Sequence, residues 1–283
     1  MPTVKHQAWT SATWVWDTAA ADGGCTQVLD ELRSWITAVN LNASQSGKPV
    51  ALLRDETSST TTNFRGWTIE FAQPGHATEK MYHQWFSAST TICQSYFGDT
   101  FTDDTSRGGY GTVNTVDADT SVSFLVTGVT TSFDSYIAYD TTDGQEFFVW
   151  GWWADASTTR SDWLGYFKDQ NGNWMAIQMD GASTNMGAFD PVKATPGMNQ
   201  QSAWNRGTTG LSNALFQATW WGGGNPAGML AGDTFTLQYV INNPNVLQST
   251  STATPGSYIT VNGSSDQYIR VGYEGPWVRY TPV

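Results

Sequence analysis

The chain has 283 residues, which is enough for one large domain or two smaller ones with a sizeable core. Its 13 Lys and Arg against 25 Asp and Glu give a formal charge of −12. Binding to a nucleic-acid backbone depends on Lys and Arg, so this charge argues against a nucleic-acid partner and against an anionic membrane surface. The simpler role of the excess acid is to keep the protein in solution.

Aromatic residues make up 14% of the chain, and 15 of them are Trp. Each ring buries a large area, so much of the core must come from rings. Such an excess also suits wide, flat contacts between sheets, between subunits or with sugars.

One amphipathic helix is predicted near the N-terminus. An extended segment with Trp9, Trp14 and Trp16 precedes a turn at 22–24, after which Thr26 can cap a helix running to about Asn40. Asp30 and Glu31 would then occupy the first turn, where acidic residues are favoured. The apolar positions have helical spacing: Val28, Leu29, Leu32, Trp35, Ile36 and Val39.

Beyond the helix the apolar pattern changes to a period of two, which is typical of strands. The nearly continuous apolar run 146–153 predicts a strand buried on both faces, and Asn171-Gly172 predicts a tight hairpin. The polar stretches 180–213 and 242–256 are expected to be long loops or docking arms. Strands are expected at 50–53, 64–71, 81–86, 121–126, 136–139, 146–153, 163–168, 174–179, 216–221, 234–240, 258–261, 268–273 and 277–280.

These elements predict a mainly β fold, β-sandwich or jelly-roll-like, with one N-terminal amphipathic helix. We expect an α+β part over 1–120, with its helix near 26–40, and a β-sandwich part with long polar loops over 121–283. One composite domain is the alternative.

The sequence predicts no catalytic, cofactor or metal site. The start MPTVKHQAWT lacks the apolar region of a secretory signal, so Cys25 and Cys93 are expected to be free thiols. No stretch approaches ~18 apolar residues, so no membrane partner is expected. His6, His76 and His83 lack metal-ligand spacing, and neither a nucleophile elbow nor a phosphate-binding loop is present.

Glycoside hydrolysis would need two carboxyl groups flanking a sugar. The candidates are Glu70, Glu146 and Glu274 on expected strands, and Asp140, Asp143 and Asp162 near turns. Nothing in the sequence pairs any two of them, so each is equally well an ordinary strand or turn residue.

Tryptophans on adjacent strand positions indicate a binding surface, because neighbouring side chains point to opposite faces. One ring of Trp152-Trp153 or of Trp220-Trp221 would enter the core while the other faces outward. The alternative is that both are buried between the sheets and the helix. The residues predicted to form a subunit interface or a glycan-stacking platform are Trp150, Trp153, Trp220, Trp221 and Trp277.

The order of these segments resembles a class of tailed-phage virion structural proteins. The resemblance covers roughly residues 9–180, through TQVLDELRSWI, FRGWTIEFA, MYHQWFSAS, EFFVWGWW and DWLGYFKDQNGNWMAI. It implies a helix packed on a β-sheet and a protein that sits beside other virion subunits in the tail, the baseplate or the head surface. It implies no catalytic residues.

We therefore expect a non-enzymatic virion structural protein that assembles in the host cytoplasm with itself and with other virion subunits. Its neighbours would bury aromatic faces, as obligate interfaces do. The first alternative is a carbohydrate-binding module or adhesin that stacks sugars on Trp153 or Trp221 and binds a cell-surface glycan. The lesser alternative is a glycoside hydrolase.

Overall fold

The computed structural model describes most of the strands, the helix and several turns. The described residues are 5–9, 15–16, 25–42, 48–55, 66–73, 76–87, 92–98, 100–102, 112–114, 122–125, 131–132, 134–153, 161–168, 172–179, 186–189, 199–204, 212–221, 235–241, 245–248, 254–260, 266–271 and 276–280.

The central sheet has six antiparallel strands in the order β1-β11-β12-β13-β14-β15. Apart from β1, it is a meander in which strands that follow one another in sequence are neighbours. Its strands are β1 (Lys5–Trp9), β11 (Asp134–Asp140), β12 (Phe147–Trp153), β13 (Ser161–Lys168), β14 (Trp174–Met179) and β15 (Met186–Phe189).

The N-terminal sheet is also antiparallel, in the order β3-β4-β5-β6-β9, and its first four strands form a second meander. Its strands are β3 (Val50–Asp55), β4 (Gly66–Gln73), β5 (His76–Ser87), β6 (Ile92–Gly98) and β9 (Val122–Leu125). The helix α1 (Cys25–Asn42) precedes β3 in the chain.

The C-terminal sheet follows the order β16-β17-β19-β22-β21-β20, with β18 paired to β17. Its strands are β16 (Asn199–Trp204), β17 (Ser212–Trp221), β18 (Phe235–Ile241), β19 (Val246–Gln248), β20 (Tyr258–Thr260), β21 (Gln267–Arg270) and β22 (Trp277–Tyr280). Two short pairs complete the set: β2 (Val15–Trp16) with β10 (Thr131–Ser132), and β7 (Thr100–Thr102) with β8 (Thr112–Asn114).

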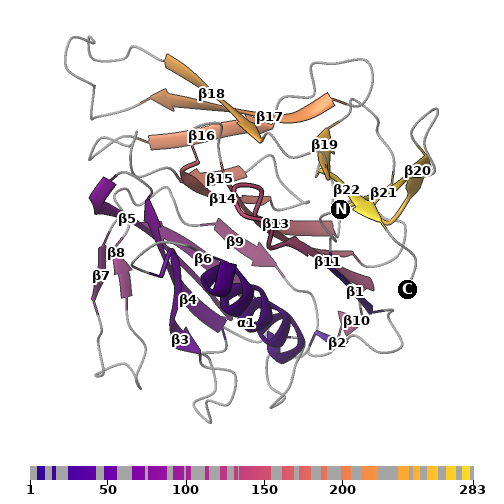
Figure 1. Ribbon diagram of the computed structural model, residues 1–283, viewed down its shortest axis with the longest axis horizontal. Helices are drawn as coiled ribbons and strands as arrows, with labels where there is room; N and C mark the ends of the chain where they lie inside the picture. The colour runs from indigo at the N-terminus through magenta and orange to yellow at the C-terminus, as the bar shows by residue number, and fades with distance from the viewer. Residues whose placement is uncertain are drawn as a thin grey trace.

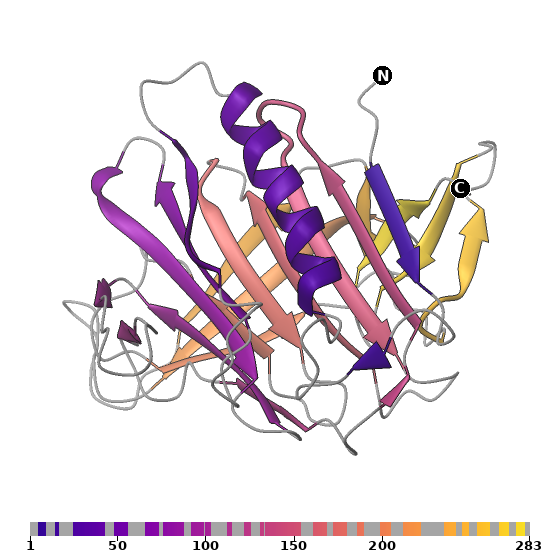
Figure 2. The same cartoon turned by 90° about the horizontal axis from the view of Figure 1, so that it is seen from below.

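The mainly β fold with one N-terminal helix is thus confirmed, and its sheets are stacked. Figure 1 shows the central sheet between the N-terminal sheet and the C-terminal sheet. The helix runs along the central sheet, beside the N-terminal sheet (Figure 2). Because the central sheet is covered on both sides, all seven residues of β12 are buried, as the continuous apolar run predicts.

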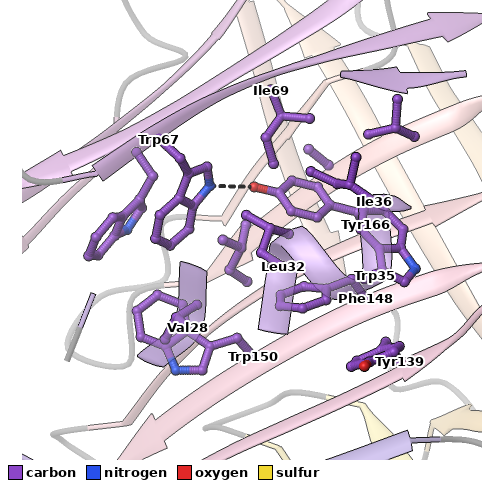
Figure 3. Packing of buried hydrophobic residues seen from close by; sticks show 14 of the residues in the cluster. Val28, Leu32, Trp35, Ile36, Trp67, Ile69, Tyr139, Phe148, Trp150 and Tyr166 are labelled. Carbon is purple, nitrogen blue, oxygen red and sulfur yellow. Dashed lines mark hydrogen bonds between the residues drawn. The ribbon is translucent and has the colours of Figure 1, made fainter. Parts of the chain in front are cut away.

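One face of the central sheet, α1 and the N-terminal sheet share a single core (Figure 3). Trp67 and Trp85 reach it from the N-terminal sheet, and Trp150 and Tyr166 from the central sheet. The rings of Trp67 and Trp85 stack with centroids 4.6 Å apart, and the Trp150 ring meets Trp85 edge-on at 5.3 Å. The expected boundary near residue 120 therefore lies between two parts that contribute to the same core.

The other face of the central sheet packs on the C-terminal sheet. The Tyr136 ring on β11 lies 6.0 Å from the Tyr280 ring on β22. Asn245 donates a 3.2 Å hydrogen bond to Oδ2 of Asp140, where β11 ends. Gly256 lies close enough to Trp153 that a Cβ built on it would be 3.0 Å from the indole. The two sheets are therefore joined by the Tyr136–Tyr280 ring contact, the Asn245–Asp140 hydrogen bond and the close approach of Gly256 to Trp153.

Several local predictions can be compared with the structure. The helix begins at Cys25, so Thr26 lies inside its first turn, and Asp30 and Glu31 fall beyond that turn. The predicted hairpin turn at Gly172 is confirmed, since this glycine has a positive φ angle of 82° between the paired strands β13 and β14. Gly144, in the turn after β11, also has a positive φ angle of 79°. The prediction of long loops was wrong in part, because 180–213 contains β15 and β16 and 242–256 contains β19.

Candidate functional site

Three of the five tryptophans predicted to meet a partner are buried by the chain itself. Trp150 and Trp277 are 0% exposed and Trp153 is 7% exposed. The outward ring expected of Trp152-Trp153 is not found, because both strand faces are covered. Trp220 and Trp221 end β17, but their side chains lie outside the described residues. Contact of the three buried rings with a partner would require the chain to open.

The Trp150 ring is fully accommodated inside the core. Its Nε1 donates a 2.9 Å hydrogen bond to Oγ of Ser135, and the ring stacks on Trp152 at 4.0 Å. A buried Trp with its N–H paired has the contacts of a structural core residue.

The carboxylates considered for glycoside hydrolysis make structural contacts. Glu70 accepts hydrogen bonds from Lys80 at 2.8 Å and from Tyr82 at 2.9 Å. Nζ of Lys168 lies 2.8 Å from Oε2 of Glu146 in a largely buried ion pair. These contacts tie neighbouring strands together.

The remaining hydrolase candidates do not form a common site in the described structure. Asp140 accepts a 2.8 Å hydrogen bond from the backbone N–H of Thr142, which fixes the turn after β11. Asp143 is exposed in that turn, while the Asp162 side chain and all of Glu274 lie outside the described residues. Within the described residues, no group of three or more His, Cys, Asp or Glu side chains could hold a metal ion.

A buried polar relay crosses the core. Nε1 of Trp67 donates a 3.0 Å hydrogen bond to the Tyr166 hydroxyl, which lies 2.6 Å from Nδ1 of His83 (Figure 3 shows the Trp67–Tyr166 bond). Burial raises the pKa of Tyr166 far above its usual range, so the phenol stays protonated. With Trp67 donating, the hydroxyl hydrogen can point to His83. The relay thus joins both sheets.

A tyrosine cluster lies where the C-terminal sheet meets β1 and β11; we define it as His6, Tyr136, Tyr258 and Tyr280. The rings of Tyr258 and Tyr280 are 4.6 Å apart, and Tyr258 is 53% exposed. Nδ1 of His6 contacts the buried hydroxyl of Tyr136. Burial, followed by the charge of Arg279, lowers the pKa of His6 to about 4. The cluster therefore runs from solvent to a neutral, half-buried imidazole.

An open groove of about 580 Å³ lies between α1 and β3. Ile36 and Val50 form its buried floor, while Leu41 stands 79% exposed at the C-terminal end of α1. The full lining is Arg33, Ile36, Thr37, Asn40, Leu41, Lys48, Val50, Ala51 and Leu52. We call this surface the α1–β3 groove.

The α1–β3 groove also contains an open strand edge. Among the described strands, β3 pairs only with β4. The carbonyl of Pro49 accepts a 2.9 Å bond from the N–H of Ala72 on β4, so by alternation Val50 and Leu52 direct their backbone groups away from β4. Asn40 on α1 donates a 2.9 Å bond to the Val50 carbonyl, in agreement with this direction. The helix thus covers the edge at Val50, and no other described segment pairs with it at Leu52.

Two charged residues line the groove, Arg33 and Lys48. Arg33 is held by Asp30 and Asp55, and the hydrogen bond to Asp55 raises the pKa of Arg33. Lys48 is exposed, and within the described residues it takes part in no ion pair. In the described part of the chain, the groove therefore presents one guanidinium paired with two carboxylates and one ammonium group without an ion pair.

Comparison with protein-family models, with curated proteins and with solved structures finds no match to this chain. In the described part of the chain, no helix is long and apolar enough to cross a membrane.

Proposed function

We propose that this chain is a non-enzymatic structural subunit of a tailed-phage virion, which assembles with copies of itself and with other virion subunits. The α1–β3 groove is the observation that carries the proposal, because it combines an apolar floor, an exposed Leu41 and a strand edge with which no described strand pairs. Open edges are templates for pairing with another chain unless they are blunted. The phage assignment draws on the order of segments over residues 9–180.

A second exposed surface supports assembly through two different contacts. Tyr258 is the other large apolar side chain that stands exposed in the described residues, and tyrosines are enriched at interface centres. Figures 1 and 2 place β3 and β20, which carries Tyr258, at opposite ends of the molecule. Two unlike surfaces on one subunit give head-to-tail contacts, which close into rings or extend into filaments.

The test is the native mass of the purified protein, followed by negative-stain imaging of the same fraction. A ring, a closed oligomer or an ordered array is the expected result. A monomer at all concentrations, with no ordered particle, would contradict the proposal.

Glycan binding is the second candidate function, and the exposed ring of Tyr258 favours it. The stacking residue would then be Tyr258 in place of the buried Trp153. A glycan array comparing the wild-type chain with Tyr258→Ala tests this directly. Binding that survives the substitution would remove Tyr258 from the candidate site.

A further inference from the structure

We infer that β1 is a pH-sensitive strand, which the neutral side chain of His6 holds on the edge of the central sheet and which protonation of His6 releases while the rest of the sheet stays folded. The inference goes beyond the proposed function, because it concerns how the chain itself responds to acid and depends on no partner. It rests on the few contacts that hold β1, on the surroundings of the two ring nitrogens of His6 and on the charges near them.

β1 is an edge strand that contributes little to the core. In the described part of the chain it pairs only with β11. The structure describes the exposure of four of its side chains: Lys5 and Ala8 are exposed, and His6 and Gln7 are half-buried. By contrast, six of the seven residues of β11 are buried, and β11 also pairs with β12 over its full length. Segments with few buried apolar contacts open locally most easily, so β1 can leave without opening the core.

His6 joins β1 to the other members of the tyrosine cluster. Its ring lies 5.7 Å from the ring of Tyr136 on β11 and 6.3 Å from the ring of Tyr280 on β22, and Figure 2 shows β1 at the side of the central sheet next to the C-terminal strands. Nδ1 contacts the Tyr136 hydroxyl, whereas Nε2 is buried and has no hydrogen-bond partner in the described structure. A neutral imidazole can satisfy this site by placing its one N–H at Nδ1. The protonated form carries a second N–H at Nε2, which would be buried without an acceptor.

The charged groups of β22 and β1 do not compensate a positive charge on His6. Among the described residues, His6 forms no ion pair. Burial, followed by the guanidinium of Arg279 on β22, lowers the pKa of His6 to about 4. The carboxylate of Asp266 pairs with Arg279 at 2.6 Å, and Lys5, the other charged residue of β1, is a second cation. A proton on His6 would therefore add a positive charge that no carboxylate of these strands neutralises.

The two carboxylates of β11 are also placed away from His6 or bound elsewhere. Asp140 accepts the two hydrogen bonds described above, from the turn after β11 and from the C-terminal layer. Asp134 lies four residues from Ala138, the register partner of His6, which places it about 13 Å along the strand. In the described structure, the site of His6 thus suits a neutral ring and disfavours a charged one.

His6 is therefore the member of the tyrosine cluster that gains a charge on mild acidification. Burial raises the pKa of Tyr136 far above its usual range and that of Tyr258 to about 12, so both phenols are already protonated. In a released strand the pKa of His6 returns to its ordinary 6.5, so the released state binds a proton more readily than the docked state. The ratio of released to docked strand therefore rises as the pH falls from 6.5 toward 4. The two pKa values give a limit of about 20-fold between pH 7 and pH 5, which partial exposure of the ring reduces to about tenfold.

Hydrogen exchange followed by mass spectrometry at pH 7, 6 and 5 tests the inference, with rates corrected for the intrinsic pH dependence of amide exchange. The protection of the peptide that contains β1 should fall about tenfold between pH 7 and pH 5, while that of the peptide containing β13 and β14 should change less than twofold. This range lies above the ordinary pKa of carboxyl groups, so it isolates the histidines. His6→Gln keeps a polar side chain that takes up no proton, so its β1 protection should be equal at pH 7 and pH 5. His76→Gln, at the start of β5 in the N-terminal sheet, is the matched control and should keep the wild-type response.

Three results would overturn the inference. The first is a wild-type β1 protection that does not change with pH, and the second is one that falls equally in His6→Gln. The third is an equal fall in the peptide of β13 and β14, which would mean unfolding of the whole sheet instead of release of one strand. If His6→Gln already exposes β1 at pH 7, Arg279→Gln decides: removing this cation should reduce the tenfold response to less than about fivefold, because the docked imidazole then binds a proton more readily. A response that Arg279→Gln leaves at tenfold counts against the inference.

Discussion

Removing one oxygen from the core tests the buried relay. In Tyr166→Phe the ring and its contacts stay, including the stacked Trp35 ring at 6.1 Å. The change deletes the acceptor of the 3.0 Å bond from Trp67 and the hydroxyl that lies 2.6 Å from His83. Both partners are 0% exposed, so water cannot replace the lost bonds.

The expected loss of stability follows from the number of buried polar groups that lose their contact with the Tyr166 hydroxyl. A buried donor or acceptor left without a partner costs ~1–3 kcal/mol, and two such groups with partial relaxation give about 2–4 kcal/mol. A domain is typically stable by only about 5–15 kcal/mol, so the loss is a large share of the total. With an unfolding entropy of ~2.1 cal/mol/K per residue, the midpoint of thermal unfolding should fall by about 3–7 °C.

Equilibrium urea unfolding, followed by tryptophan fluorescence, measures the effect. The matched control is Tyr258→Phe, which removes the same atom from a side chain that is 53% exposed and should cost less than about 1 kcal/mol. If Tyr166→Phe were no more destabilising than Tyr258→Phe, the relay would not be a stabilising network.

Three further predictions concern the stacking of the layers. Gly256→Ala should destabilise by about 2–3 kcal/mol and Gly172→Ala by about 1 kcal/mol, since both have positive φ but only Gly256 lies against Trp153; equal losses in urea unfolding would argue against close packing there. The pKa of His6 is lowered from 6.5 to about 4, so the folded state binds a proton less readily than the unfolded state. The stability of the protein is therefore highest above pH 6.5 and decreases as the pH falls from 6.5 toward 4. After allowance for the partial exposure of the side chain, this pH-dependent change in the free energy of unfolding amounts to about 1–2 kcal/mol. His6→Gln should reduce the pH dependence of stability by that amount, and an unchanged pH profile would show that burial does not lower the pKa of His6. Trp150→Ala should cost about 3–5 kcal/mol, because it empties a core position; intact thermal stability with loss of binding would instead restore Trp150 as a surface residue.

The sequence predicts the helix and the strands better than it predicts which of them pack together. The spacing of Val28, Leu32 and Trp35 identifies the buried face of α1, and all three are 0% exposed. The alternation over 64–71 and the apolar run over 146–153 identify β4 and β12. These signals are local, since they depend on helical and strand periodicity within one segment.

The candidate surface is harder to predict from the sequence, because it depends on contacts between distant residues. Leu41 lies just beyond the predicted helix, which ends near Asn40, and only the structure shows that α1 continues through it and leaves its side chain exposed. The open edge of β3 requires knowledge of which strands pair. Trp153 shows the converse problem: adjacent aromatics predict one outward ring only where one sheet face is free, and the C-terminal sheet covers that face.

Burial of the central sheet on both faces changes what must determine strand register. In a half-buried sheet, a slip by one residue would expose apolar side chains, and this penalty fixes the alignment. In β12 all seven residues are buried, so a slipped strand would still present apolar side chains to both neighbouring layers. The aligned state must instead be selected by contacts that exist in one register alone. The Trp150–Ser135 bond and the Trp67–Tyr166 bond are such contacts. A few buried polar atoms therefore select one register in a sheet whose apolar side chains would fit several.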